Sequence, residues 1–177
     1  MAAKSKGKIR HFAISVPDPW AAAEFYKEAF GLEELGETDS KLAEGVFLTD
    51  GVINLALLKF KDEEAAQGKG TDYVGLHHVG FWVDDVPSAG KEVTAAGAKW
   101  LMGDPTDTSG YEVKYTDPNG IIFDISQGGW GGAQKNPGEA NNPAPHDTRK
   151  NLAKFDERRA QASAAVEKRK VKALETA

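Results

Sequence analysis

The chain has 177 residues, with 22 Lys and Arg against 27 Asp and Glu, four His and no Cys. Without a thiol, disulfide scaffolds, Cys-ligated zinc sites, iron–sulfur clusters and cysteine nucleophiles are excluded. The length indicates one compact domain with a modest extra segment, and a hydrophobic content of 40% is sufficient to build a core.

The net charge of −5 is divided unevenly along the chain. Residues 149–177 carry a net charge of +5 and the preceding residues a net charge of −10. An acidic body does not favour nucleic-acid binding. The basic start MAAKSKGKIR is not followed by an apolar region, and no run approaches the ~18 apolar residues that span a bilayer. We therefore expect a cytoplasmic protein with neither a nucleic-acid nor a membrane partner.

The first part of the chain predicts a strand, a helix and three further strands. Residues 8–17 are rich in β-formers and alternate in polarity, which is typical of a strand. The segment WAAAEFYKEAFG favours a helix, and Gly31 stands where a glycine would end it. A polar, Gly-containing linker is expected at 60–73, after strands near residues 32–36, 44–49 and 52–59.

The pattern then repeats. LHHVGFWVDD at 76–85 predicts a strand, PSAGKEVTAAGA a helix that Gly97 would end, and further strands are expected near 99–102, 111–116 and 121–126. His11 and the residues after it align with His78 and the residues after it without a gap, at an offset of 67 residues. The order of elements predicts an α+β fold with two βαβββ modules, at about 8–60 and 74–127, in one domain of residues 1–127.

The remaining residues differ in composition. Residues 128–148 are rich in Gly, Pro and Asn and predict an irregular linker. Residues 149–177 predict a basic helical tail with a narrow apolar face that Arg159 interrupts. Such a helix is marginal alone. We expect it to pack on the acidic body or on a neighbouring subunit, in a homodimer.

Three residues gain a chemical meaning from the repeat. His11 and His78 occupy the same place on the first strand of each module, and Asp124 lies on the last strand of the second. Two imidazoles and a carboxylate form a ligand set for a divalent cation. His77 adjoins His78, so its side chain is expected on the other face of the strand, as a packing or surface residue. His146 lies in the irregular segment and is expected to be solvated.

Four stretches, taken in order, carry a family resemblance. They are IRHFAISVPDPWAAAEFYKEAFGL, VINL, LHHVGFWVDDV and YTDPNGIIFDIS, within about residues 8–127. Together they resemble the vicinal oxygen chelate superfamily, which includes glyoxalase I, methylmalonyl-CoA epimerase, fosfomycin-resistance transferases, extradiol dioxygenases and bleomycin-resistance proteins. The resemblance implies paired βαβββ modules whose mixed sheet curls around a metal cavity, and a metal chelated by adjacent oxygens of a small-molecule substrate.

The resemblance also implies which residues bind the metal. The first-strand histidines of the family match His11 and His78, and the terminal acid of the second module, usually Glu, matches Asp124. The terminal acid of the first module falls in VINL, where Asn54 replaces the usual Glu. Because Asn is not a general base at neutral pH, Asn54 could supply only a weak carbonyl ligand or a hydrogen bond to substrate. Tyr115 is the other catalytic candidate, as an acid or hydrogen-bond donor.

The walls of the expected cavity follow from strand alternation. Ala13 and Ser15 on one histidine strand, and Gly80 and Trp82 on the other, would share the metal-facing side. Ala13 and Gly80 leave space beside the metal. Trp82 and Phe47 are candidates to stack on a planar substrate, and Ser15 is a further substrate-binding candidate.

Three functions are compatible with these residues. The two-histidine, one-carboxylate set matches non-haem Fe(II) oxygenases, which favours a dioxygenase-like enzyme with Fe(II) or Mn(II) on a small phenolic or vicinal-oxygen substrate. A glyoxalase-type isomerase, lyase or transferase, with Ni, Zn, Co or Mn, would need a proton acceptor other than Asn54. A non-catalytic small-molecule-binding resistance protein is the third alternative.

Overall fold

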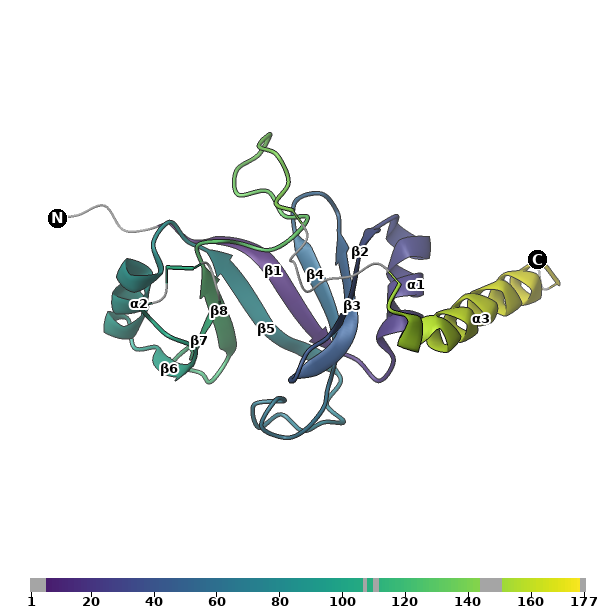
Figure 1. Cartoon of the computed structure of the whole chain (residues 1–177), viewed down its shortest axis with the longest axis horizontal. Coiled ribbons are helices and arrows are strands. Elements are labelled where there is room, and N and C mark those ends of the chain that lie inside the picture. Colours follow the sequence, from purple (N-terminus) through teal and green to yellow (C-terminus); the bar gives the residue numbers. More distant parts are fainter. Residues whose placement is uncertain (1–5, 107, 110–111, 144–150, 176–177) are drawn as a thin grey trace.

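The structure, a computed structural model, describes residues 6–106, 108–109, 112–143 and 151–175. It contains one eight-stranded mixed sheet (Figure 1). The first module comprises β1 (Lys8–Ser15), α1 (Pro19–Phe30), β2 (Glu33–Asp39), β3 (Ala43–Thr49) and β4 (Asn54–Phe60). The second comprises β5 (Gly75–Trp82), α2 (Val86–Ala95), β6 (Lys99–Met102), β7 (Val113–Thr116) and β8 (Ile122–Ser126). A 3₁₀ turn (Ala153–Phe155) and the helix α3 (Asp156–Glu175) follow.

The strand order confirms the predicted duplication. The order is β2-β3-β4-β1-β5-β8-β7-β6. From the centre of the sheet to its edge, each half has the first strand of the module, then its last strand, and then the two strands that lie between them in the sequence. The first and last strands of each module are parallel, and the modules meet where β1 runs antiparallel to β5. This pseudo-twofold arrangement places two equivalent pairs of strands, β4 with β1 and β8 with β5, side by side at the centre of the sheet. The sheet is curved and open, with β2 and β6 as its edges.

Local sequence signals explain where α1 begins and ends. The Asp18 side chain accepts hydrogen bonds from the backbone N–H groups of Trp20 and Ala21, which would otherwise lack partners at the helix start. Gly31 follows the last residue with a φ of 69°, a left-handed conformation that costs glycine little. The helix therefore ends where the sequence predicted.

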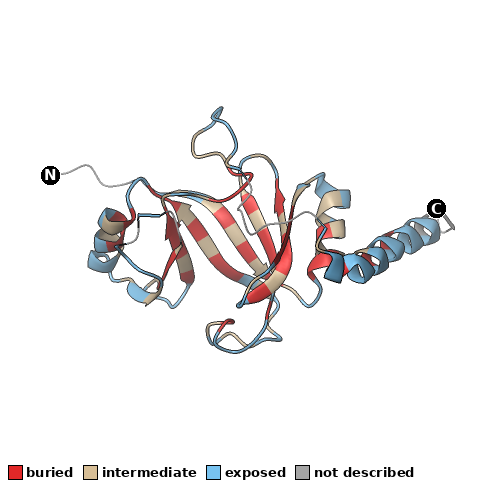
Figure 2. Ribbon diagram, viewed as in Figure 1, coloured by how far each residue is buried: buried red, intermediate tan, exposed pale blue. Residues whose placement is uncertain are grey.

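The two faces of the sheet have different neighbours. On one face α1 packs on Val46, Leu48 and Leu57, and α2 packs in the equivalent way on Val113 and Ile125. Buried residues alternate with less buried ones along the central strands (Figure 2). The opposite face carries the candidate ligands His11, His78 and Asp124. The two helices therefore form hydrophobic cores with the sheet without covering the candidate metal site.

A β-bulge breaks the alternation at the two adjacent histidines. His78 pairs with Ala13, but the next partner of β1, Ile14, pairs with Leu76, so His77 has no partner in the β1–β5 ladder. An extra residue of this kind bends a strand and re-aims its side chains. Regular alternation, from which we expected the two imidazoles on opposite faces, therefore does not hold here.

The segment between the modules is more than a polar linker. Ala65 and Ala66 are buried in a small cluster with Ala43 and Phe60. This packing holds the Ala66 carbonyl next to β5, where the carbonyl accepts a hydrogen bond from His77 Nε2 at 3.1 Å.

The tail packs on the first module of its own chain (Figure 1). Phe155 is buried, with its ring centroid 4.4 Å from that of Trp20. Buried Glu37 accepts hydrogen bonds from the Trp20 indole N–H, the Leu152 backbone N–H and the Arg159 guanidinium. Arg159 therefore interrupts the apolar stripe because it meets a buried carboxylate.

Further ion pairs join the basic tail to the acidic body. Lys154 pairs with Asp39 and Arg158 with Glu44, and Lys170 Nζ lies 3.6 Å from a Glu28 carboxylate oxygen. The charge asymmetry of the sequence thus serves docking within one chain, and the homodimer stays a prediction. Among the described residues, no helix is long and apolar enough to cross a membrane.

We expect Phe155→Ala to lower the free energy of unfolding by about 3 kcal/mol, because it leaves a cavity beside Trp20. Val171→Ala is the control, since Val171 is exposed on α3, the helix that directly follows the 3₁₀ turn containing Phe155, and should change stability by less than about 0.5 kcal/mol. Urea unfolding of both variants measures the difference. Equal stabilities would contradict the docking of the tail.

Candidate metal centre

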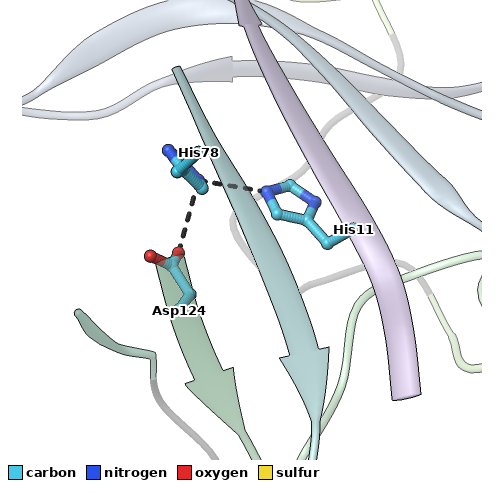
Figure 3. Close-up of side chains that lie close together, drawn as sticks. All are labelled: His11, His78 and Asp124. Carbon is cyan, nitrogen blue, oxygen red and sulfur yellow. Dashed lines mark hydrogen bonds and ion pairs between the residues drawn. The ribbon is translucent and has the colours of Figure 1, made fainter. Parts of the chain in front are cut away.

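His11, His78 and Asp124 lie together on three neighbouring strands (Figure 3). Gly80 of β5 pairs with His11 of β1 on one side and with Asp124 of β8 on the other. One ligand atom from each of the three residues lies within 4.8 Å of the others, and all three residues are buried. The pseudo-twofold axis thus brings together side chains that are 67 and 46 positions apart in the sequence.

The hydrogen bonds of His78 determine which of its nitrogens carries the proton. The Ala66 carbonyl can only accept, so His77 donates its Nε2–H to it. Burial lowers the pKa of His77 to about 4, so its ring is neutral and its Nδ1 is an acceptor. His78 Nδ1, 2.8 Å away, therefore donates to His77. This assignment, made from the network, leaves a lone pair on His78 Nε2.

The same reasoning holds for His11. The Asn54 amide donates from Nδ2 to the Gly131 carbonyl at 2.9 Å, which leaves its oxygen as acceptor. His11 Nδ1 donates to that oxygen at 2.7 Å. Burial lowers the pKa of His11 to about 4 and that of His78 well below its usual value, so both rings are neutral. His11 Nε2 also carries a lone pair.

Three electron-pair donors therefore converge. The two Nε2 atoms are 3.2 Å apart, and His78 Nε2 lies 3.3 Å from Asp124 Oδ2. Asp124 Oδ1 is buried without a hydrogen-bond partner. Ligand atoms around a metal with bonds of ~2.1 Å lie about 3.0–3.4 Å apart. The donor set and its spacing thus fit a divalent transition-metal ion.

Two ionisable side chains at the site were missed by the sequence reasoning. Lys114 of β7 donates a hydrogen bond to Asp124 and lies 3.3 Å from a Glu112 carboxylate oxygen. Burial opposes the charge of Lys114, but the two carboxylates raise its pKa. Burial likewise opposes the charge of Glu112, whose pKa is nevertheless lowered to about 2, chiefly by the Lys114 ammonium. The signal that could have revealed Lys114 is the alternation of side chains along β7. Lys114 pairs with Asp124 of β8, so the two side chains lie on the same face of the sheet.

The other site residues predicted from the sequence lie at different distances from the three candidate ligands. Asn54 is at the centre, where it orients His11. Phe47 pairs with Ala56 on the same sheet face as Asn54, one strand further out. Ser15 is buried four residues along β1 from His11, which is about 13 Å at the usual strand rise. Tyr115 belongs to the core under α2, on the opposite face from Lys114, and is not brought to the ligands. His146 lies outside the described residues.

Trp82 contacts the segment after β8 rather than an open cavity. Its indole N–H donates to the Gln127 carbonyl at 2.9 Å, and it packs in a buried cluster with Trp130 and Ala133. Trp130 stacks on the ring of His11, with centroids 4.9 Å apart and an interplanar angle of 5°. Trp130, in the predicted irregular linker, thus covers the His11 side of the candidate metal centre.

A separate apolar groove of about 540 Å³ lies on the other face of the sheet. It is lined by Val79, Phe81 and residues of α2. Val79 and Phe81 alternate with His78 and Gly80 along β5, so this groove does not open onto the ligands.

A family model described as the Glyoxalase/Bleomycin resistance protein/Dioxygenase superfamily matches residues 8–125. The chain belongs to this superfamily. All three candidate ligands lie within the matched range, whereas Trp130 and α3 lie beyond it.

Two curated relatives cover the same part of the chain. An ethylmalonyl-CoA/methylmalonyl-CoA epimerase of Cereibacter sphaeroides is 30% identical over 136 residues, which are 68% of this chain and 98% of the relative. An uncharacterised protein of Bacillus subtilis, YwbC, is 28% identical over 130 residues, 68% of this chain and 97% of the relative. The chain thus contains nearly the whole length of each relative.

Solved structures show the same fold at lower identity. A hypothetical protein of Bacillus halodurans has a TM-score of 0.58 at 20% identity and covers 76% of this chain and 99% of its own. The methylmalonyl-CoA epimerase of Mycobacterium tuberculosis has a TM-score of 0.57 at 18% identity, over 71% of this chain and 91% of its own. A Streptomyces coelicolor methylmalonyl-CoA epimerase has a TM-score of 0.55 at 21% identity, over 67% and 92%.

The pKa of His11 predicts how the stability of this superfamily member depends on pH. Burial lowers that pKa to about 4, whereas an imidazole in the unfolded chain titrates near ~6.5. Between these values the folded state binds fewer protons than the unfolded state, so stability is full above about pH 6.5 and falls as the pH falls toward 4. We expect His11 to account for a loss on the order of 2–3 kcal/mol between pH 7 and pH 4.5.

Urea unfolding of metal-free protein at the two pH values measures this loss. His11→Gln should show a smaller loss than the wild type, because its side chain does not titrate. If both proteins lose the same stability, His11 is not held as a buried neutral ring.

Proposed function

We propose that this protein is a divalent-metal-dependent enzyme of the isomerase type, which holds neighbouring oxygens of a small substrate and moves a proton at an adjacent carbon. The convergence of two unprotonated imidazole nitrogens and a carboxylate carries the proposal. The relative of 30% identity, named as an ethylmalonyl-CoA/methylmalonyl-CoA epimerase, supports the reaction type.

The roles of the residues follow from their hydrogen bonds. His11, His78 and Asp124 are the proposed metal ligands, and Asn54 and His77 hold the two imidazoles in the tautomer that presents Nε2. A bound divalent cation would act as a Lewis acid on a carbonyl oxygen. Mn, Fe, Co, Ni and Zn all suit two imidazoles and one carboxylate, and their order of affinity does not by itself decide which is bound.

A proton-transfer reaction needs a group that carries the proton. Asn54 is not a base, and Tyr115 lies on the opposite face of the sheet. Lys114 and Glu112 are ionisable and lie beside Asp124. We therefore assign the proton transfer to the Lys114–Glu112 pair, in place of the carboxylate expected at position 54: the ionised Glu112 carboxylate would accept the proton from the substrate carbon and the Lys114 ammonium would donate one back.

The dioxygenase-like reading that the sequence favours is the second candidate. One observation supports it: the Asn54 oxygen accepts a hydrogen bond from His11, so two histidines and one carboxylate remain as ligands. Such a triad with open positions is the arrangement of non-haem Fe(II) oxygenases. Fe(II) or Mn(II), a phenolic substrate and O₂ would then be required.

Metal content tests the ligand assignment. We expect His11→Ala, His78→Ala and Asp124→Ala each to reduce bound metal to background, because two remaining ligands hold a divalent ion poorly. His77→Gln should weaken metal affinity about 10–100-fold, since it alters only the orientation of His78. Tyr115→Phe is the control and should retain metal. Metal retained in all three alanine variants, measured by mass spectrometry of the purified protein, would overturn the site.

The reaction type is tested by excluding oxygen. We expect the metal-loaded protein to exchange the α-hydrogen of methylmalonyl-CoA for deuterium in anaerobic D₂O, as followed by NMR, and Lys114→Met to slow this exchange at least tenfold. O₂ uptake with a catechol, and no deuterium incorporation, would favour the dioxygenase instead.

A further inference from the structure

The space that the sequence predicts beside the metal is filled by a side chain of the protein itself. Gly80 has no Cβ, and a Cβ built there would lie 2.6 Å from the outer carbons of the Trp130 indole. Gly80 is also the strand partner of both His11 and Asp124. The indole therefore lies directly over the backbone between two of the proposed ligands.

The indole makes the contacts that a bound molecule would make. Its flat face lies parallel to the ring of His11, at 4.9 Å between centroids. Its N–H donates a hydrogen bond to the Glu112 carboxylate. Only 5% of Trp130 is exposed. Trp130 thus fills a slot with one flat wall, a floor without a side chain and an acceptor at its edge.

We propose that the Trp130 indole occupies the substrate subsite in a closed form of the protein, and that a flat substrate with two adjacent oxygens and an N–H or O–H donor replaces it. This inference rests on the proposed function. The oxygens face the metal ligands, the flat part lies on His11, and the donor takes the place of the indole N–H at Glu112.

Of the parts of the chain that surround the candidate metal centre, the segment that carries Trp130 is the one best able to move. Strands β1, β5 and β8 each pair with a strand on both sides, so displacing one of them would break two ladders. In contrast, four of the residues 128–133 are Gly. They are held by individual hydrogen bonds, among them Asn54 to the Gly131 carbonyl at 2.9 Å and Thr49 to the Gly132 carbonyl at 3.0 Å.

Displacement of the segment that carries Trp130 would also affect the orientation of a proposed metal ligand. The Gly131 carbonyl fixes the Asn54 amide, which in turn fixes the tautomer of His11. Displacement of Trp130 therefore uncovers His11 and frees the amide that orients it in the same movement.

Zn²⁺-loaded protein and two hydroxamates test the proposal. Benzohydroxamate carries two adjacent oxygens, an N–H and a flat ring, and acetohydroxamate carries the same oxygens and N–H without the ring. Calorimetry first measures Zn²⁺ binding, then the Kd of each hydroxamate for the wild type, Trp130→Ala and the control Trp100→Ala. Trp100 is exposed on β6, with its indole N–H bonded to the Gly103 carbonyl.

We expect Trp130→Ala to bind benzohydroxamate at least tenfold more tightly than the wild type, and acetohydroxamate less than threefold more tightly. Trp100→Ala should match the wild type. In the wild type, benzohydroxamate should shift tryptophan emission to longer wavelength as Trp130 becomes exposed, and Trp130→Phe should lack this shift. Trp130→Phe, which keeps a smaller ring on His11, should show an intermediate gain and serves where the alanine variant does not fold.

The outcomes separate the two proposals. If the wild type binds no Zn²⁺, the proposed function fails and this inference with it. If Zn²⁺ binds but benzohydroxamate has the same Kd in the wild type and the Trp130 variants, or binds without an emission change, the substrate does not replace Trp130 and the proposed metal site stands.

Discussion

The candidate site depends on one constraint: an imidazole removed from water must be neutral and must still find a partner for its single N–H. His11 and His78 meet this constraint through Nδ1, with Asn54 and His77 as acceptors. Each ring is thereby obliged to present Nε2 as a lone pair. Two lone pairs and a carboxylate that face one another at 3.2 and 3.3 Å repel unless a cation lies between them.

The duplicated topology makes this convergence possible. Parallel pairing of β1 with β4 puts Asn54 opposite His11, and parallel pairing of β5 with β8 puts Asp124 opposite Gly80. Because the modules meet along β1 and β5, equivalent positions of the two halves lie on the same face of the sheet and close together. The helices pack on the other face of the sheet and the tail on α1, so neither competes with the site for space.

The polar neighbours change the chemistry that the ligands alone would suggest. Lys114 brings a positive charge to Asp124, and Glu112 links that charge to the indole of Trp130. A carboxylate is missing at position 54, but an ionisable pair lies nearby, Lys114 on β7 and Glu112 directly before that strand. Trp130 connects this pair to His11, through a hydrogen bond to Glu112 on one side and ring stacking on His11 on the other.

The sequence by itself determined the duplicated fold, the ends of α1 and the three candidate ligands. Strand periodicity and helix caps are local patterns, and the 67-residue repeat is found by comparing the sequence with itself. It also predicted that a basic tail would dock on an acidic body. Only the tertiary structure decided the roles of His77, Lys114, Glu112 and Trp130. His77 acts through a β-bulge, which strand alternation does not reveal, and the others depend on contacts between residues distant in the chain. Such contacts are set by how the strands register and by what covers them, and neither is encoded in a local pattern.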